Sequence, residues 1–249
     1  MPRKWFALFL TLFSLVATSS LAHAWNHTEH RVIASFASRQ FDEPTKHRIV
    51  EVFRKHPAYA DPWSNRETNG SDEVLNLLWN TSVFPDDARR EPWHKFNRPK
   101  AHHVNYCILA DQGNKVEPPG RGENILNPYL AHVCQVEDPR PPKEAKALHL
   151  SWILHQAGDI HQPLYAGARF SKALPEGDRG GNGVHFPNPR ARGDRENNLH
   201  AYWDDPPGAD RSPAAVAGLA EQTTKEHQTA NLAAELGNRY SRVRTEESV

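Results

Sequence analysis

The segment His149–Leu164, with the sequence HLSWILHQAGDIHQPL, constrains the fold most, because it joins a helical pattern to two candidate ligands. It reads as the end of an amphipathic helix, expected over residues 143–159, that runs into a turn bounded by Pro163. His155 and Asp159 are four residues apart, so both project from one face of this helix. An imidazole and a carboxylate at this spacing can bind one metal ion, although most such pairs are solvated.

Helical patterning continues along the rest of the chain and predicts an all-α fold with a single domain over residues 25–249. Further helices are expected over residues 28–41, 44–56, 71–78, 101–110, 124–136, 198–204, 214–226 and 228–239. Loops are expected over residues 58–70, 84–99, 116–123 and 170–195. No alternating strand pattern and no repeat is found in the sequence, and the tail from about residue 240 is expected to be disordered.

The first 24 residues have the features of a secretory signal peptide. Arg3 and Lys4 form a basic start, and the apolar stretch that follows is shorter than a membrane span. An A-x-A cleavage site ends the segment at Ala22–Ala24. Removal of these residues would leave Trp25 as the N-terminus of an exported protein, either periplasmic or secreted; the alternative is an uncleaved anchor.

Charge and cysteine content bear on partners and compartment. The chain has 30 Lys plus Arg and 30 Asp plus Glu, so no bulk charge directs it to nucleic acid or to acidic membranes. Its two cysteines, Cys107 and Cys134, are expected to form a disulfide in an oxidising compartment, the alternative being two buried free thiols. We expect a monomer without stable membrane association.

Further candidate ligands occur in short motifs. They are Trp25 and His30 in WNHTEH, Asp86 in FPDD, His102 in HHVN, and His200 and Asp204 in NLHAYWD. Each has an ordinary explanation: a surface histidine for His30, a helix N-cap for Asp86, an ion pair for His200 and Asp204. As an ordered set they are better explained by metal binding, because the separate explanations would all have to coincide.

These motifs resemble those of the S-one/P-one (nuclease I) family of zinc-dependent single-strand nucleases, which shares an all-α fold with bacterial zinc phospholipase C. The DIHQPL, DRGGN and NLHxxWD runs carry the resemblance, in the order and at spacings plausible for the family, and it covers nearly the whole mature chain. The family's N-terminal tryptophan coincides with Trp25 at the expected cleavage site. The resemblance implies a helical phospholipase C/nuclease fold with a trinuclear zinc cleft.

The resemblance implies that up to three zinc ions are bound. The first would be held by two aspartates and two histidines: Asp86, His102, His155 and Asp159. The second would be held by the free amine and carbonyl of Trp25, by His30 and by Asp159, which bridges the two ions. Asp86 and Asp159 are thereby the implied catalytic carboxylates.

The third zinc site departs from the family pattern. His200 and Asp204 match two of its three ligands, but Tyr165 stands where the family has histidine. Neutral tyrosine is a poor zinc ligand, and its phenol loses a proton only near pH 10. Three possibilities stay open: the third ion binds weakly, Tyr165 binds it as a phenolate, or a nearby histidine such as His161 or His185 replaces it.

The implied reaction is hydrolysis of single-stranded RNA and DNA to 5′-phosphate products, with removal of 3′-phosphates from nucleotides. Paired metal ions suit it because they neutralise a phosphate oxygen and activate water. The family places an aromatic residue after the first-zinc histidine to stack a base, and this chain has His103 there. Asn105 is a candidate for hydrogen bonding to a base edge. Asn182 is a candidate for contact with the scissile phosphate, or else a simple turn residue.

Two other functions fit the same residues. A phospholipase C of the same fold would need an apolar rim around its site, and no run of Trp, Phe or Leu lies near the candidate ligands in the sequence. The second is a degenerate zinc-binding protein whose third site has failed at Tyr165. The expected partners are single-stranded RNA, DNA and 3′-nucleotides as substrates.

Overall fold

A computed structural model describes residues 27–60, 63, 72–118, 124–189, 191, 193–205 and 212–226. The expected signal peptide, Trp25, the helix expected over residues 228–239 and the tail lie outside these residues, as does most of the loop expected over residues 58–70. Within the described ranges, no helix is long and apolar enough to cross a membrane.

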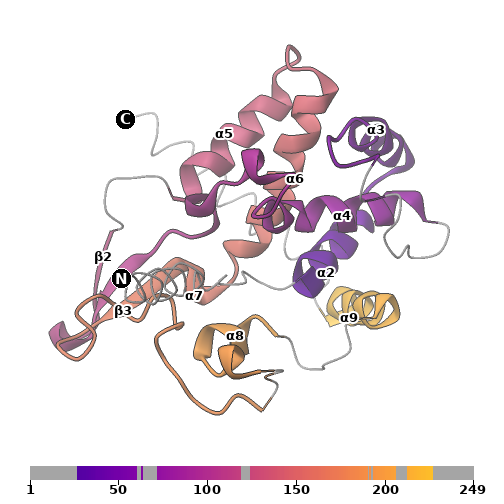
Figure 1. The fold of residues 1–249 in the computed structure, drawn as a ribbon. Helices are drawn as coiled ribbons and strands as arrows, with labels where there is room; N and C mark the ends of the chain where they lie inside the picture. The colour runs from indigo at the N-terminus through magenta and orange to yellow at the C-terminus, as the bar shows by residue number, and fades with distance from the viewer. Residues whose placement is uncertain are drawn as a thin grey trace, which may run out of the picture.

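The described residues are mostly helical, as the sequence pattern predicts (Figure 1). The helices are α2 (His27–Ser38), α3 (Glu43–Phe53), α4 (Glu73–Asp87), α5 (Leu126–Glu137), α6 (Lys143–Asp159), α7 (Pro163–Ala166), α8 (Leu199–Trp203) and α9 (Pro213–Glu226). Helix α6 has the bounds predicted for it and packs against α2, α3, α4 and α5. It is therefore the helix around which the others are arranged.

Capping residues explain where several helices begin. Asp42, Asp72 and Asn198 precede α3, α4 and α8, and each accepts a hydrogen bond from the backbone N–H three residues later at 2.9–3.0 Å. Such a bond satisfies one of the N–H groups that have no partner inside a helix. Pro44, in the first turn of α3, lacks an N–H at a position where none is needed.

Helix α4 continues into the stretch where the sequence predicts a loop. Phe84 and Pro85 lie inside the helix, which ends at Asp87. Proline in a helix interior costs about 3 kcal/mol because it removes a hydrogen bond. Here both Phe84 and Pro85 are buried, and the apolar area they remove from water offsets that cost. As a result Asp86 lies in the last turn of α4 and is not an N-cap.

A small sheet corrects the all-α expectation. Strands β1 (Tyr106–Leu109), β2 (Lys115–Glu117) and β3 (Gly167–Phe170) lie in the order β2-β1-β3, beside α7 and at one side of the helices (Figure 1). β1 is antiparallel to β2 and parallel to β3. The helix predicted over residues 101–110 is therefore wrong. The pairing of β1 with β3 joins segments far apart in the chain, so tertiary context overrides the local pattern.

The disulfide expected between Cys107 and Cys134 is also wrong, because both cysteines are free. Cys107 is half-buried on β1, and Cys134 is exposed on α5. Strand β1 pairs with the other two strands, whereas α5 packs against α6. The two thiols therefore belong to different parts of the fold, and the alternative of two buried thiols is not met either.

The apolar core joins α2, α4, α6 and α9. Ala34, Trp79, Ala147 and Val216, one from each helix, belong to a single buried cluster. Nε1 of Trp79 also donates a hydrogen bond to Oγ of Ser35 at 2.7 Å, which fixes α4 against α2. This packing brings the start of α2 to the C-terminal ends of α4 and α6.

Candidate metal centre

Five of the predicted ligands converge at the point where these helix ends meet. They come from the first turn of α2, the last turns of α4 and α6, and the 3₁₀ helix η3 (Pro99–His102): His30, Asp86, His102, His155 and Asp159. Four are fully buried, and the side chain of Asp86 is 11% exposed. The tertiary fold therefore gathers residues that are widely separated in the sequence.

Three of these side chains, His102, His155 and Asp159, place one ligand atom each around a common point, and Asp86 adjoins His155. Nδ1 of His102 lies 2.9 Å from Oδ2 of Asp159 and 3.0 Å from Nε2 of His155. Nε2 of His155 is 3.2 Å from the same carboxylate oxygen and 3.7 Å from Oδ1 of Asp86. Two ligands of a tetrahedral zinc ion with bonds of about 2.0–2.1 Å are about 3.3 Å apart. The measured spacings are close to that value.

His30 brings an imidazole to the other carboxylate oxygen of Asp159. Nε2 of His30 lies 3.6 Å from Oδ1 of Asp159, and its ring stacks on that of His155 with centroids 3.9 Å apart. Asp159 thus turns Oδ2 towards His102 and His155, and Oδ1 towards His30. This is the arrangement that a carboxylate bridging two metal ions requires. Trp25, the other ligand implied for the second ion, lies outside the described residues.

The protonation states suit metal binding. Burial, and then the neighbouring His155, lower the pKa of His30 to about 3, so its imidazole is neutral at pH 7. Burial by itself would raise the pKa of Asp159, but His155 and the hydrogen bond with His102 hold it well below the usual range. Metal ions bind neutral histidine and ionised carboxylate. The cluster offers both without a change of protonation at these two residues.

Oδ1 of Asp159, the oxygen that faces His30, is buried and has no hydrogen-bond partner among the described residues. Buried polar atoms are almost always paired, and leaving one unpaired costs about 1–3 kcal/mol. A hydrogen bond on the far side of the ring orients His155: its Nδ1–H donates to the carbonyl oxygen of Ser82 at 2.8 Å. Its Nε2 therefore faces the cluster. The residues present thus fit a bound zinc ion.

His200 and Asp204 form a second group at the end of α8. Nε2 of His200 lies 3.3 Å from Oδ2 of Asp204. Each side chain is oriented by a further contact: Nδ1 of His200 donates to the carbonyl of Gly180 at 2.7 Å, and Nε2 of Gln162 donates to Oδ1 of Asp204 at 3.0 Å. Two ligand atoms are therefore held facing each other.

Tyr165 lies against this second group. Its ring meets that of His200 edge-on, with centroids 5.1 Å apart, and its hydroxyl is buried without a hydrogen-bond partner in the described part of the chain. Burial, and then the charge of Asp204, raise the pKa of the Tyr165 phenol well above its usual value. His161 and His185 are exposed, and Nδ1 of each contacts a backbone carbonyl. The fold therefore places Tyr165 beside His200.

The DRGGN run forms a turn that supports His200. Oδ1 of Asp178 accepts hydrogen bonds from the backbone N–H groups of Arg169 and Gly180, both at 3.0 Å. Gly180 has a φ of +61°, and a Cβ there would lie 2.5 Å from the carbonyl oxygen of Leu164, so only glycine fits. Asn182 turns back on the same turn, with Nδ2 donating to the carbonyl of residue 179 at 3.0 Å. Its contacts match those of a turn residue.

The two candidate base contacts lie on the segment between η3 and β1. His103 is half-buried, and burial, followed by the neighbouring His102, lowers the pKa of its imidazole. Asn105 is exposed and has a φ of +57°. The N–H of Val104, between them, donates to the carbonyl of Tyr165 at 2.9 Å. This segment therefore connects the two groups of ligands.

Two residues of the site were missed in the sequence. Arg89 follows Asp86 by three residues, and its Nη2 lies 2.8 Å from Oδ1 of Asp86. The Arg89 side chain is 20% exposed. Gln162, inside the DIHQPL run, orients Asp204 and also caps α7 through Leu164 N. The sequence signal for Arg89 is its position three residues after the candidate ligand Asp86, a spacing that places both on one face of a helix. Gln162 gave no signal apart from its place in the motif.

Gly158, next to the bridging Asp159, leaves space for His30. A Cβ at Gly158 would lie 2.8 Å from Nδ1 of His30 and 3.2 Å from Cδ1 of Ile33. We expect Gly158→Ala to displace His30 and to reduce, by about a hundredfold, the phosphodiester cleavage that the family resemblance implies; this is the cost of a misplacement of about 1 Å. Steady-state cleavage of an oligonucleotide, together with zinc content, measures this.

Gly218→Ala is the matched control, because Gly218 lies within α9 and a Cβ there would meet nothing within 4 Å. It should keep full activity and gain up to about 1 kcal/mol of stability from the better helix propensity of alanine. Equal activity of the two variants would show that His30 does not need the space at Gly158.

Comparison with known proteins agrees with the motifs. A family model described as S1/P1 Nuclease matches residues 25–248. Endonuclease 3 of Arabidopsis thaliana is 26% identical over 211 residues, covering 82% of this chain and 60% of that protein. Endonuclease 2 of the same plant is 23% identical over 233 residues, covering 89% of this chain and 70% of that protein. The match to Endonuclease 3 thus spans less than two thirds of that protein's length. The chain belongs to the S1/P1 nuclease family.

Proposed function

We propose that this protein is a zinc-dependent nuclease that hydrolyses single-stranded RNA and DNA to 5′-phosphate products and also removes 3′-phosphates from nucleotides. The observation that carries the proposal is the close convergence of His102, His155 and Asp159, with ligand atoms 2.9–3.2 Å apart. Membership of a nuclease family and two endonuclease relatives support it.

The first zinc ion would be held by His102, His155, Asp159 and Asp86, and the second by His30, Asp159 and the N-terminus at Trp25. When bound, such a pair withdraws charge from a phosphodiester and lowers the pKa of water towards about 7. Asp159 would contribute one carboxylate oxygen to each of the two sites. The hydrogen bond from Nδ1–H of His155 to the carbonyl oxygen of Ser82 keeps that imidazole in the tautomer that leaves Nε2 free to bind zinc.

Substrate approaches the cluster from the side of Asp86 and Arg89. Their side chains are 11% and 20% exposed, whereas those of His30, His155 and Asp159 are fully buried. The guanidinium of Arg89 thus adds a positive charge where a phosphate anion arrives, and charge-assisted hydrogen bonds from arginine to phosphate are strong.

Selectivity for single strands follows from the segment after His102. The half-buried imidazole of His103 offers a surface on which an unpaired base can stack, and the exposed Asn105 offers a carboxamide to its edge. A base inside a duplex has neither its face nor its Watson–Crick edge free. Unpaired RNA and DNA are therefore the substrates proposed.

Digestion of a single-stranded RNA and a single-stranded DNA oligonucleotide by the chain beginning at Trp25 tests this function. Cleavage that requires zinc, stops with chelator and leaves 5′-phosphate ends is the expected result. Absence of cleavage by a protein shown to contain zinc would contradict the proposal.

Phospholipase C of the same fold is the competing activity. The structure does expose apolar side chains next to ligands, since Ile160 is 37% and Trp203 is 51% exposed. This differs from the expectation from the sequence, in which no run of Trp, Phe or Leu lies near the candidate ligands. An exposed tryptophan also suits stacking on a base, and both relatives named above are endonucleases. Hydrolysis of phosphatidylcholine faster than of RNA would favour the lipase.

Tyr165 decides whether the protein binds a third zinc ion well. A neutral phenol is a weak donor, so we propose that the His200 and Asp204 pair binds zinc more weakly than the bridged pair. Tyr165→His should restore a three-ligand site and raise the zinc content by one ion per chain. Elemental analysis of the purified protein after dialysis measures this independently of activity.

Tyr165→Phe separates the remaining possibilities, since it keeps the ring and removes only the hydroxyl. Zinc content should stay the same in this variant if the phenol is not a ligand. A loss of one zinc ion in Tyr165→Phe, with no gain in Tyr165→His, would show instead that Tyr165 already binds metal as a phenolate.

A further inference from the structure

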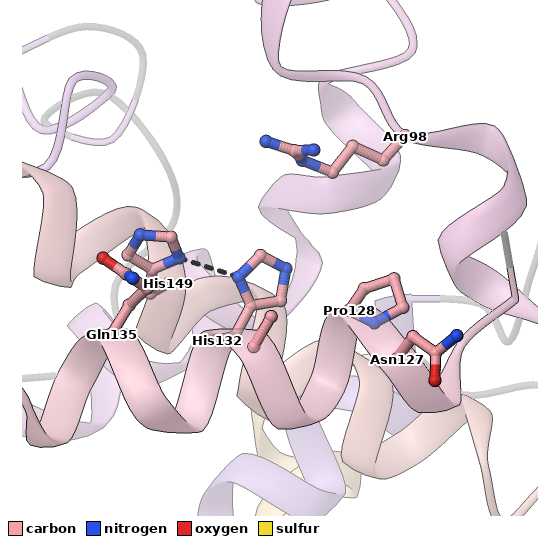
Figure 2. Close-up of a pocket in the computed structure, with 7 residues that line it drawn as sticks. Arg98, Asn127, Pro128, His132, Gln135 and His149 are labelled. Atoms are coloured by element: carbon pink, nitrogen blue, oxygen red, sulfur yellow. Dashed lines mark hydrogen bonds between the residues drawn. The ribbon is translucent and has the colours of Figure 1, made fainter.

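A pocket outside the candidate metal centre lies between α5, the start of α6 and the segment before η3 (Figure 2). Its volume is about 530 Å³, and its polar lining comes from five side chains: Arg98, Asn127, His132, Gln135 and His149. Pro128 adds an apolar surface. The polar groups are one guanidinium, two imidazoles and two carboxamides, and none of the described residues that line the pocket is acidic.

Two histidines meet at the back of this pocket. Nδ1 of His132 lies 2.7 Å from Nδ1 of His149, and Figure 2 draws this hydrogen bond. One Nδ1 must donate and the other accept, so the accepting ring, when neutral, carries its proton on Nε2. The pair can therefore present an N–H from either ring by exchanging tautomers.

The second nitrogen of His132, Nε2, is a buried polar atom beside this pocket. His132 is 5% exposed, and its Nε2 has no hydrogen-bond partner among the residues that the structure describes. Figure 2 shows this nitrogen turned away from His149, into the space between Arg98 and Pro128. Buried polar atoms are usually paired, and a ligand in the pocket with an acceptor atom would supply a partner for this one.

The positive charge of Arg98 favours an anionic ligand in the pocket. Its side chain is exposed and reaches over the two imidazoles, and no salt bridge to it is found within the described ranges. Burial, then His149, then Arg98 lower the pKa of His132 to about 4. A cation would meet the guanidinium without any carboxylate to compensate, so two imidazoles do not make a metal site here. An anion would be attracted by Arg98 and can accept a hydrogen bond from Nε2 of His132.

We propose that this pocket binds a phosphate group through Arg98 and the Nε2–H of His132, with the attached nucleoside against Pro128. Arginine is the side chain best suited to bidentate contact with phosphate oxygens. The carboxamides of Asn127 and Gln135 supply further donors at the rim. The ligand is either a free nucleotide or phosphate, or a phosphate of the polynucleotide away from the scissile bond.

The pocket is separated from the metal centre by one indole ring. The ring of Trp152 stacks on His132 with centroids 5.9 Å apart and an interplanar angle of 13°. The same ring also packs against His102 at 5.4 Å and His155 at 6.3 Å. A phosphate in the pocket therefore lies behind the ligands, and its binding does not require the proposed nuclease activity.

Nuclear magnetic resonance of the zinc-loaded protein, labelled with ¹⁵N-histidine, tests the proposal. Titration with inorganic phosphate, and separately with 5′-AMP, should move the Nε2 signal of His132 along a saturable curve. The signals of His102 and His155 report any binding at the metal centre, so binding there is distinguished from binding in the pocket. No movement of the His132 signal at millimolar concentrations of both probes would overturn the proposal.

Arg98→Gln should raise the Kd of the His132 site about tenfold, the size expected for one charge-assisted hydrogen bond. Arg48→Gln, which removes an exposed arginine from α3, is the control for the loss of charge and should change nothing. Equal Kd values for the two variants would also contradict the proposal. His132→Gln should abolish the site, and Arg98→Gln keeps the test valid if that buried substitution impairs folding.

Substrate length distinguishes the two sources of phosphate. If the pocket holds a remote phosphate of the polynucleotide, Arg98→Gln should raise KM about tenfold for a long oligonucleotide, leave kcat unchanged and not affect a dinucleotide. If it holds a free nucleotide or phosphate, KM should stay constant for both substrates while the Kd of the free ligand rises. Because the titration needs no cleavage, its outcome is independent of whether the proposed function holds.

Discussion

Asp159→Asn is expected to reduce phosphodiester cleavage by about a thousandfold or more, since the metal ions contribute several kcal/mol of transition-state stabilisation. Asp159 is the only described residue that turns one oxygen to His102 and His155 and the other to His30. Asparagine has nearly the same shape but offers one neutral carbonyl oxygen in place of two anionic ones. The variant should therefore lose zinc from both positions of the bridged pair. Cleavage rate and zinc content per chain, measured together, test this.

Asp138→Asn is the control, because this half-buried carboxylate pairs with Arg140 and lies outside the ligand cluster. It should retain both zinc ions and full activity. Circular dichroism of Asp159→Asn confirms that the helices are intact, so that a loss of activity is not a loss of fold. An Asp159→Asn protein with normal zinc content and activity would contradict the bridging role.

An extra residue placed before Trp25 is expected to remove most of the activity, by about a hundredfold or more. The proposed ligand at Trp25 is a free amine, whereas in the extended chain the same nitrogen belongs to a peptide bond and has no lone pair to donate. Under our proposal that residues 1–24 are cleaved during export, maturation and metal binding are thereby coupled. Cleavage assays and zinc analysis on proteins beginning at Trp25 and one residue earlier measure the effect.

The matched control carries the same extra residue at the C-terminus and should be fully active. A second check is to add the residue before Trp25 together with a protease site and then remove it, which should restore both zinc and cleavage. Full activity of the extended chain before removal would show that the N-terminal amine is not a ligand.

The parts of the fold that could be predicted are those determined by local sequence. Helix α6 has the bounds expected over residues 143–159, because the preceding Pro142 and the turn after Asp159 mark its two ends. The convergence of His155 with Asp159 follows from helix geometry alone. Their meeting with His30, Asp86 and His102 could be expected only from the family resemblance, because no local rule relates residues so far apart.

The errors share a physical cause. Strand β1 lies in the stretch predicted to be helical, and its pairing with β3, which follows α7, is a tertiary effect. The loop predicted over residues 84–99 begins too early, because the burial of Phe84 and Pro85 that extends α4 is a tertiary effect as well. The orienting contacts of Arg89 and Gln162 likewise depend on side-chain positions in the folded chain.

The phosphate pocket had no sequence signal either. Arg98, His132 and His149 come from three different segments, and no motif in the sequence relates them to one another. Only the 2.7 Å contact between the two imidazoles and the unpaired Nε2 of His132 reveal it. Pockets assembled from separate elements are therefore found in the structure and not in the sequence.

Zinc-edge anomalous diffraction from crystals of the protein beginning at Trp25 tests the central claim most directly. We expect one peak bonded to His102, His155, Asp159 and Asp86, and a second bonded to His30, Asp159 and the amine of Trp25. Data from Asp159→Asn crystals should lack both peaks. Crystals of active protein with no anomalous peak at this cluster, or with zinc only elsewhere, would contradict the account.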